Sequence, residues 1–291
     1  MVEYRLPKPG VVGSSPIARS IFPPMKTWQL IVESAPLPGS WNMAVDEFLF
    51  RQAEKAPCTF LRFYQWERPT ASLGYSQDAS RVVDAAFCAA HGIDIVRRMT
   101  GGKLVLHDRE VTYAVASSDT EAFTETLRDS YQLISRALLK GLAILGLSAR
   151  LAETSPPSYI KGTMPCFAFP ARDEIEIGGK KIVGSAQKRT GALFLQHGSI
   201  PLEKDEALLA AVSRPGDSEG GAGMTSLSEA LGRPMDFDGA VGPLVQGFAD
   251  FFGVSFERFA LAPADKEAVR ALQASKYASD GWTYRRGTAA R

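Results

Sequence analysis

The 291 residues carry 33 Lys and Arg against 32 Asp and Glu, and 45% of them are hydrophobic. The nearly balanced charge gives no electrostatic reason to expect nucleic acid or an anionic membrane as a partner, and the apolar share is typical of a globular protein with a buried core. Because Cys58, Cys88 and Cys166 form no CxxC pair and the three histidines lie far apart in the sequence, we expect neither a disulfide framework nor a metal site.

The N-terminal segment is rich in Pro, Gly and Ser and lacks the apolar core of a secretory signal. We therefore expect residues 1–25 to form a flexible tail, with Met25 as an alternative start. Residues 26–291 are expected to form a single domain with helices at its C-terminal end. No apolar run approaches the ~18 residues of a membrane span, so we expect a cytoplasmic protein.

The first half of the domain alternates short strand-like runs with helical ones. The turn residues between segments 59–66 and 70–75 favour a hairpin of two strands. Segment 79–90 has an apolar face with helical spacing and is predicted to be one compact helix. The other predicted elements are strands over 29–33, 93–97, 104–107 and 111–115, and a helix over 40–50.

The second half begins with the longest amphipathic pattern of the chain, in which apolar residues recur every three or four positions from Leu127 to Leu145. A proline-rich loop over 154–165 follows. Segments 173–177, 180–187 and 192–200 then predict a meander of three strands, with Gly178 and Gly179 in a tight turn. Ser226 and Glu229 have the spacing of a capping box for a short helix. Two further helices are expected near 241–252 and 263–276.

Because the strands come in adjacent runs with helices between them, we predict an α/β (α+β) fold with a mixed, largely antiparallel sheet flanked by helices. Neither GxGxxG nor GxxxxGK[ST] occurs in the sequence, so a common nucleotide-binding fold is not supported.

Segment 97–108 is the first candidate for chemistry. Gly101 and Gly102 allow a backbone to approach a ligand closely, and Arg97 or Arg98 can hold a phosphate or carboxylate by a forked contact. The same segment is equally compatible with a hairpin turn that carries two solvated arginines. His107 alone is more typical of a hydrogen-bonded histidine at a strand end than of a catalyst.

Cys166 is the second candidate, at the end of the proline-rich loop. A thiolate is a strong nucleophile for thioester exchange when a cationic or basic neighbour helps to remove its proton. A lone cysteine is more often a small buried hydrophobe, but a packing cysteine usually lies within a helix or strand.

Lys181 is the third candidate, in a strand-like run with Ile182 and Val183. A lysine in a dry pocket can act as a proton acceptor, whereas a solvated hairpin lysine is the usual alternative. The three small residues over 184–186 favour the pocket, because small residues within a strand indicate that something passes close by.

Together, segments 97–108, 179–187 and 196–199 resemble motifs of the biotin/lipoate protein ligase superfamily, and the resemblance extends over residues 28–286. Segments 42–47, 66–77 and 276–282 fit its other motifs. Within the superfamily, the chain is most similar to the LipM-type octanoyltransferases, which carry their nucleophile where Cys166 stands. Lys103 replaces the third glycine that ATP-dependent ligases usually have, and little sequence follows Gly253 for the extra C-terminal domain of many ligases.

The resemblance implies transfer of an octanoyl group from acyl carrier protein to the lipoyl-domain lysine of a partner, either the glycine-cleavage H protein or a 2-oxoacid dehydrogenase subunit. It implies Cys166 as nucleophile, Lys181 as the adjacent base, and no cofactor, because the acyl group arrives on phosphopantetheine. Ser185 is a candidate for oxyanion support. The residues that match the acyl pocket are Arg97, Arg98, Thr100, Gly101, Gly102, His107, Gly184, Ser185 and Ala186. A basic rim for acidic partner proteins is expected from Arg97, Arg98, Lys161, Lys188 and Arg189.

Residues 168–171 depart from the small polar residues of that family, which leaves the acyl-chain preference open. Three alternatives also stay open: an ATP-dependent lipoate or octanoate ligase, an amidotransferase that moves the acyl group between lipoyl proteins, and a non-catalytic binder of lipoylated proteins.

Overall fold

The structure, a computed structural model, describes residues 26–124, 126–153, 173–214 and 223–284. Its main feature is an eight-stranded sheet with the order β11-β1-β2-β6-β10-β9-β8-β7. Strand β1 runs parallel to β11 and β2, and the other neighbours are antiparallel. This confirms the predicted mixed, largely antiparallel sheet. The strands are β1 (Thr27–Val32), β2 (Thr59–Tyr64), β6 (Glu110–Ser117), β7 (Arg150–Leu151), β8 (Ile175–Ile177), β9 (Lys180–Thr190), β10 (Leu193–Pro201) and β11 (Ser255–Arg258).

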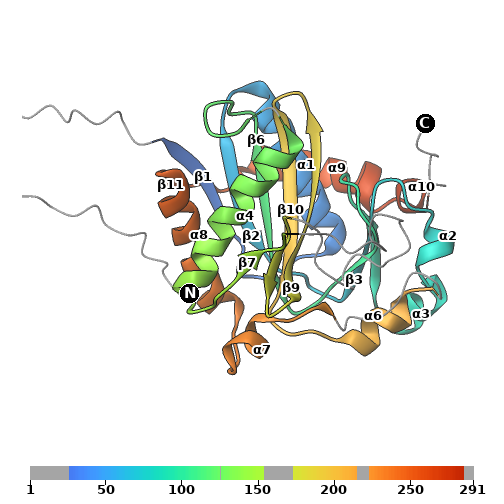
Figure 1. Cartoon of the computed structure of the whole chain (residues 1–291). Coiled ribbons are helices and arrows are strands. Elements are labelled where there is room, and N and C mark those ends of the chain that lie inside the picture. The colour runs from blue at the N-terminus through green and yellow to red at the C-terminus, as the bar shows by residue number, and fades with distance from the viewer. Residues whose placement is uncertain (1–25, 125, 154–172, 215–222, 285–291) are drawn as a thin grey trace, which may run out of the picture.

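Helices cover both faces of this sheet, as Figure 1 shows. Helices α4 (Leu127–Ile144) and α8 (Phe237–Phe252) pack on one face, and α1 (Gly39–Lys55) and α9 (Pro263–Leu272) on the other. Side chains of β6 alternate between the two cores: Tyr113 and Val115 pack beneath α4 and α8, whereas Ala114 and Ala116 pack beneath α1. Every residue of β6 is therefore buried.

Helices α4 and α8 touch backbone to backbone at two glycines. A Cβ atom placed on Gly247 would lie 2.3 Å from the backbone nitrogen of Gly141, and one placed on Gly141 would lie 2.8 Å from the Cα of Leu244. The absence of a side chain at both positions is what permits this close approach.

A second sheet of three strands has the order β4-β3-β5, with β3 parallel to β4 and antiparallel to β5. Its strands are β3 (Thr70–Leu73), β4 (Asp94–Arg97) and β5 (Val105–His107), and the helices packed against it are α2 (Ala79–Val82), α3 (Ala85–Ala90) and α6 (Glu206–Val212). Because β3 lies between β4 and β5, the chain from 98 to 104 must cross from one edge of this sheet to the other.

Two predictions for the first half are wrong. Segments 59–66 and 70–75 form no hairpin, because β2 pairs with β1 and β6 whereas β3 belongs to the small sheet. Segment 79–90 is two helices, because Val83 is extended and the Asp84 carboxylate starts a new helix by accepting a hydrogen bond from the backbone of Phe87.

The second half follows the sequence pattern more closely. Strands β8, β9 and β10 form the predicted meander, and Gly178 and Gly179 have φ of +58° and +79°. Ser226 accepts a hydrogen bond from the backbone of Glu229 at the start of α7 (Leu227–Leu231). Helix α8 begins at Phe237 rather than near 241, and α9 continues through a π-helical turn (Gln273–Tyr277) before α10 (Asp280–Thr283). Strand β11 and helix α6 were not predicted.

Predictions for the tail over 1–25 and the loop over 154–165 lie outside the described residues. Within the described part of the chain, no helix is long and apolar enough to cross a membrane.

Candidate active site

A pocket of about 100 Å³ lies between the small sheet and the face of the large sheet that α1 covers. Of the predicted acyl-pocket residues, Arg98, Gly102, His107, Gly184, Ser185 and Ala186 line it, and so does Lys181. Its lining also includes Met43, Tyr64, Trp66, Val105, Glu174, His197 and Ser199, which the sequence analysis did not single out as site residues.

Lys181 is buried and lines the pocket, with its Nζ 2.7 Å from Oε1 of Glu174. The register between β8 and β9 shifts here, so that Ile182 is an additional residue in β9. The bulge lets Ile182 and Val183 both enter the core beneath α4, while Lys181 faces the pocket. The neighbouring Lys180 is exposed and pairs with Glu229 on the surface.

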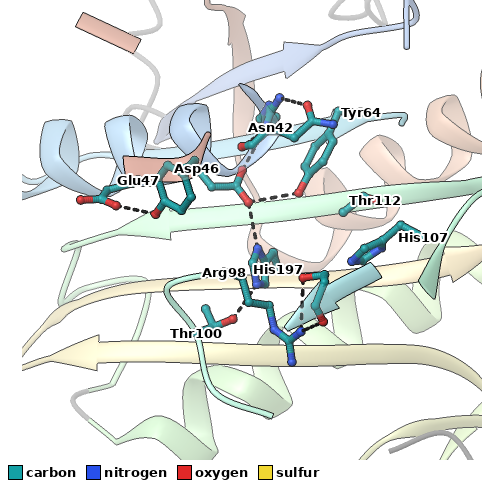
Figure 2. A network of polar contacts seen from close by, with 12 residues as sticks. Asn42, Asp46, Glu47, Tyr64, Arg98, Thr100, His107, Thr112 and His197 are labelled. Carbon is teal, nitrogen blue, oxygen red and sulfur yellow. Dashed lines mark hydrogen bonds and ion pairs between the residues drawn. The ribbon is translucent and has the colours of Figure 1, made fainter. Parts of the chain in front are cut away.

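Three residues distant in the sequence form a buried chain of hydrogen bonds, shown in Figure 2. Asp46 on α1 lies 2.8 Å from Nδ1 of His197 on β10, and Nε2 of His197 lies 2.7 Å from the hydroxyl of Thr100. An ionised carboxylate only accepts hydrogen bonds, so Nδ1 carries the ring proton and Nε2 accepts one from Thr100.

The ionisation of Asp46 is favoured by its neighbours. Arg62 donates to one carboxylate oxygen at 2.8 Å, and the hydroxyl of Tyr64 donates to the other at 3.1 Å. Burial raises the pKa of Asp46, but hydrogen bonding to His197 and the charge of Arg62 outweigh it and hold this pKa below its usual range. Burial, together with the charges of Arg98 and His107, lowers the pKa of His197 more than Asp46 raises it, which favours the neutral ring.

A second buried carboxylate, Glu110 on β6, fixes His107. Nδ1 of His107 lies 2.8 Å from Oε1 of Glu110, and the ring stacks on Trp66 with a centroid distance of 4.0 Å. Thr112 and Ser199 also donate to Glu110. Burial raises the pKa of Glu110, but the charge of His107 and these hydrogen bonds outweigh it and lower the pKa overall. His107 is therefore a fixed wall of the pocket.

The prediction of solvated arginines, or of a basic rim that includes Arg97 and Arg98, is wrong for both residues because both are buried. Arg97 lies away from the pocket lining and donates to backbone carbonyls, among them those of Gly74 at 2.8 Å and Thr283 at 2.8 Å. The indole N–H of Trp282 donates back to the carbonyl of Arg97 at 2.8 Å. Lys161 lies outside the described residues.

Arg98 lines the pocket but directs its guanidinium to the loop that follows it. It donates to the carbonyls of Gly101 and Lys103 at 2.8 and 2.7 Å. The carbonyl of Thr100 accepts from the backbone of Tyr75 at 2.8 Å. In a trans peptide the N–H points in the direction opposite to the carbonyl of the same peptide. The N–H of Gly101 therefore points away from Tyr75, and that of Gly102 points away from Arg98. No hydrogen bond from the described residues occupies either group.

The hydroxyl of Ser185 is turned to the opposite face of the sheet. It lies 2.7 Å from the hydroxyl of Tyr113, which belongs to the core beneath α4 and also accepts from Gln196 at 2.8 Å. Ser185 therefore lines the pocket beside Gly184 and Ala186 with its hydroxyl already bound to Tyr113.

Cys166, the predicted nucleophile, lies outside the described residues. Cys88 is buried and Cys58 half-buried. Burial raises the pKa of Cys88 to about 11 and also raises that of Cys58, so neither thiol is activated near neutral pH. Among the described residues, no group of three or more His, Cys, Asp and Glu is placed to hold a metal ion.

The residues that the sequence analysis missed are polar groups buried against partners far along the chain. Asp46 and His197 entered the sequence analysis only within the motif segments 42–47 and 196–199. The one signal in the sequence was the occurrence of charged or ionisable residues within strongly apolar segments.

Comparisons with known proteins identify the family of this chain. The model of the lipoyl protein ligase A/B catalytic domain matches residues 38–249. Octanoyltransferase LipM of Kyrpidia tusciae is 38% identical over 279 residues, which cover 90% of this chain and 100% of the relative. Octanoyltransferase LipM of Carboxydothermus hydrogenoformans is 36% identical over 271 residues, with coverages of 90% and 100%.

Solved structures show the same fold. A lipoate-protein ligase A bound with ATP has a TM-score of 0.76 at 24% identity, covering 89% of this chain and 99% of that one. A bipartite lipoate protein ligase from Thermoplasma acidophilum has a TM-score of 0.73 at 23% identity, with coverages of 90% and 97%. From its family match and its full-length relatives, the chain belongs to the lipoyl protein ligase A/B catalytic-domain family and is an acyltransferase of the octanoyltransferase kind.

Proposed function

We propose that this protein transfers an octanoyl group from acyl carrier protein to a lipoyl-domain lysine, through a thioester on Cys166. The observation that carries the proposal is that the buried Lys181 lines the same pocket as Gly102, the last residue of the Thr100–Gly102 loop. A cation and a pair of backbone N–H donors beside one cavity suit the charge that develops in acyl transfer. The octanoyltransferase relatives support the same reaction.

In the first step, the Cys166 thiolate attacks the thioester carbonyl of the donor. A carbon–sulfur bond to Cys166 forms, the bond to the phosphopantetheine sulfur breaks, and that sulfur takes the proton that Cys166 gave up. No described residue bonds the N–H groups of Gly101 and Gly102, and we assign them to the oxygen of the tetrahedral intermediate.

In the second step, the lysine amine of the acceptor attacks the Cys166 thioester. An amide bond forms, the bond to Cys166 breaks, and a proton of the amine passes to the sulfur through the Lys181–Glu174 pair. Conversion of a thioester to an amide is downhill, so the proposed reaction needs no ATP, metal or other cofactor.

The pocket walls suit an aliphatic chain. Met43, Trp66 and Val105 provide apolar surface, and each CH₂ group removed from water contributes about 0.8 kcal/mol. An octanoyl chain would thus gain roughly 5 kcal/mol, enough to select for length without a charged contact. The proposed acceptors are the glycine-cleavage H protein or a 2-oxoacid dehydrogenase subunit, in the cytoplasm.

The test is the intact mass of the protein after incubation with octanoyl-acyl carrier protein. We expect an added octanoyl group in the wild type and in Cys58→Ser and Cys88→Ser, and none in Cys166→Ser. Transfer from free octanoate with Mg-ATP that survives Cys166→Ala would establish the ligase instead. Acylation by an octanoylated H protein alone would establish the amidotransferase, and no acylation by any donor would leave a non-catalytic binder.

A further inference from the structure

Thr100 is the point at which the loop between β4 and β5 is attached to the large sheet. Its side chain is fully buried, and its hydroxyl bonds His197 on β10, which in turn bonds Asp46 on α1. A loop of the small sheet is thereby tied to a strand and a helix that lie more than 50 residues away in the sequence on either side. Figure 2 shows the three side chains in line.

The protonation of His197 sets the direction of the attachment. With Nδ1–H directed at Asp46, Nε2 of the neutral ring accepts from the Thr100 hydroxyl, whereas Nε2–H of a protonated ring would donate to it. The charged or titratable groups that face the ring are Asp46 from α1, Arg98 from the loop and His107 from β5. Burial and the charges of Arg98 and His107 disfavour a second ring proton, and Asp46 favours it.

The loop needs such external support because its next two residues are glycines. Gly102 has φ of +91°, and its carbonyl packs against Gly74, where a Cβ atom would lie only 1.9 Å from that oxygen. A glycine backbone has many accessible conformations, so contacts outside it must select this one. Arg98 holds the loop by its carbonyls, and His197 holds it by the side chain of Thr100.

We propose that Asp46 and His197 are positioning residues that hold the Thr100–Gly102 loop so that the N–H groups of Gly101 and Gly102, which no described residue bonds, meet the acyl carbonyl. The inference rests on the proposed acyl transfer. It adds that Asp46 and His197 orient the backbone N–H groups that bind the oxyanion. Neither residue touches the substrate carbonyl in this role: Asp46 fixes the tautomer of His197, and His197 fixes Thr100.

The decisive comparison is between Thr100→Val and Thr100→Ser. Valine keeps the shape but removes the hydroxyl, and we expect the single-turnover rate of acyl-enzyme formation to fall about 100-fold, the effect of misplacing a reacting group by about 1 Å. The donor concentration for half-maximal rate should change less than about threefold, since the apolar walls that bind the chain are intact. Thr100→Ser keeps the hydroxyl that bonds His197 and should recover most of the lost rate.

His197→Asn is the second variant, because the asparagine amide can still donate to Asp46 but does not reach Thr100. Its single-turnover rate should equal that of Thr100→Val. The double variant His197→Asn/Thr100→Val should be no slower than either single variant, since both substitutions remove the same hydrogen bond. His91→Asn, at an exposed histidine bonded to the carbonyl of Phe87, is the matched control and should keep the wild-type rate.

An independent readout is the ¹⁵N NMR spectrum of the histidine rings, of which the chain has only three. We expect His197 to be the Nδ1–H tautomer at pH 7 and to lose this preference in Asp46→Asn. If the wild type is acylated and Thr100→Val and His197→Asn react equally fast, the positioning role is wrong and the proposed function stands. If the wild type is acylated by no donor, the proposed function itself fails, whatever tautomer His197 has.

Discussion

The Nζ atom of Lys181 lies 2.7 Å from Oε1 of Glu174, and both side chains are buried at the wall of the pocket. Glu174→Gln keeps the size of the side chain but removes the carboxylate that can take a proton from Lys181. We expect turnover with a lipoyl-domain acceptor to fall at least about 100-fold, the usual loss when a proton-transfer group is removed.

Glu176→Gln is the matched control for that substitution. Glu176 is also buried, but it pairs with the exposed Arg150 and does not line the pocket. Turnover of Glu176→Gln should stay within about twofold of the wild type, since this side chain lies outside the pocket and its partner Arg150 is on the surface. Equal turnover of the two variants would show that Glu174 has no role in proton transfer.

The cysteines are expected to differ in reactivity. Burial raises the pKa of Cys88 to about 11 and also raises that of Cys58, so both are mainly thiols at pH 7. Iodoacetamide at pH 7 should therefore label Cys166 first, as measured by the mass of proteolytic peptides. Octanoyl-acyl carrier protein added beforehand should protect this site, and faster labelling of Cys58 or Cys88 would contradict the assignment of the nucleophile.

Stability should decrease as the pH falls. The pKa of His197 is lowered by burial, so between that value and about 6.5 the unfolded chain binds more protons than the folded one. Asp46, whose pKa is also lowered despite its burial, adds a further loss as the pH falls from about 3.9 through its folded pKa. Between pH 7.5 and 5, the free energy of unfolding measured in urea should decrease less in His197→Asn than in the wild type. Equal decreases would contradict the contribution assigned to His197.

The contact between α4 and α8 predicts opposite effects for two glycines of one helix. Gly247→Ala places a methyl group 2.3 Å from the backbone of Gly141 and should destabilise the protein by about 1–3 kcal/mol through overpacking. A Cβ atom at Gly242 meets nothing within 4 Å, so Gly242→Ala should stabilise the protein by about 0.5–1 kcal/mol. Urea unfolding measures both, and a destabilised Gly242→Ala would show that the packing argument is incomplete.

Local patterns predicted those parts of the fold whose partners are near in the sequence. The meander of β8, β9 and β10 follows from alternation and from the turn at Gly178 and Gly179, and α4 follows from its apolar spacing. The predicted hairpin over 59–75 was wrong because residues that favour β-strands do not specify which strand they pair with. The division of the chain into two sheets is set by long-range packing, which no local pattern reports.

The same distinction applies to the site. Lys181 could be singled out because the small residues 184–186 follow in the same strand, and the structure places it at the pocket. Asp46 and His197 could not be paired from the sequence, because hydrogen bonding across 151 positions leaves no periodic signal. Arg97 and Arg98 have the composition of a surface turn, and only the carbonyls that surround them in three dimensions explain their burial.

The pairing of Arg97 with Trp282 and Thr283 has a consequence for biosynthesis. During translation, Arg97 leaves the ribosome long before Trp282 and Thr283, and until then the guanidinium nitrogens that their carbonyls will bind stay hydrated. Strand β4, and the loop that follows it, are therefore expected to reach their final arrangement only after α10 has been made. A nascent chain released before residue 282 would hold the rest of the sheet framework but not an ordered site.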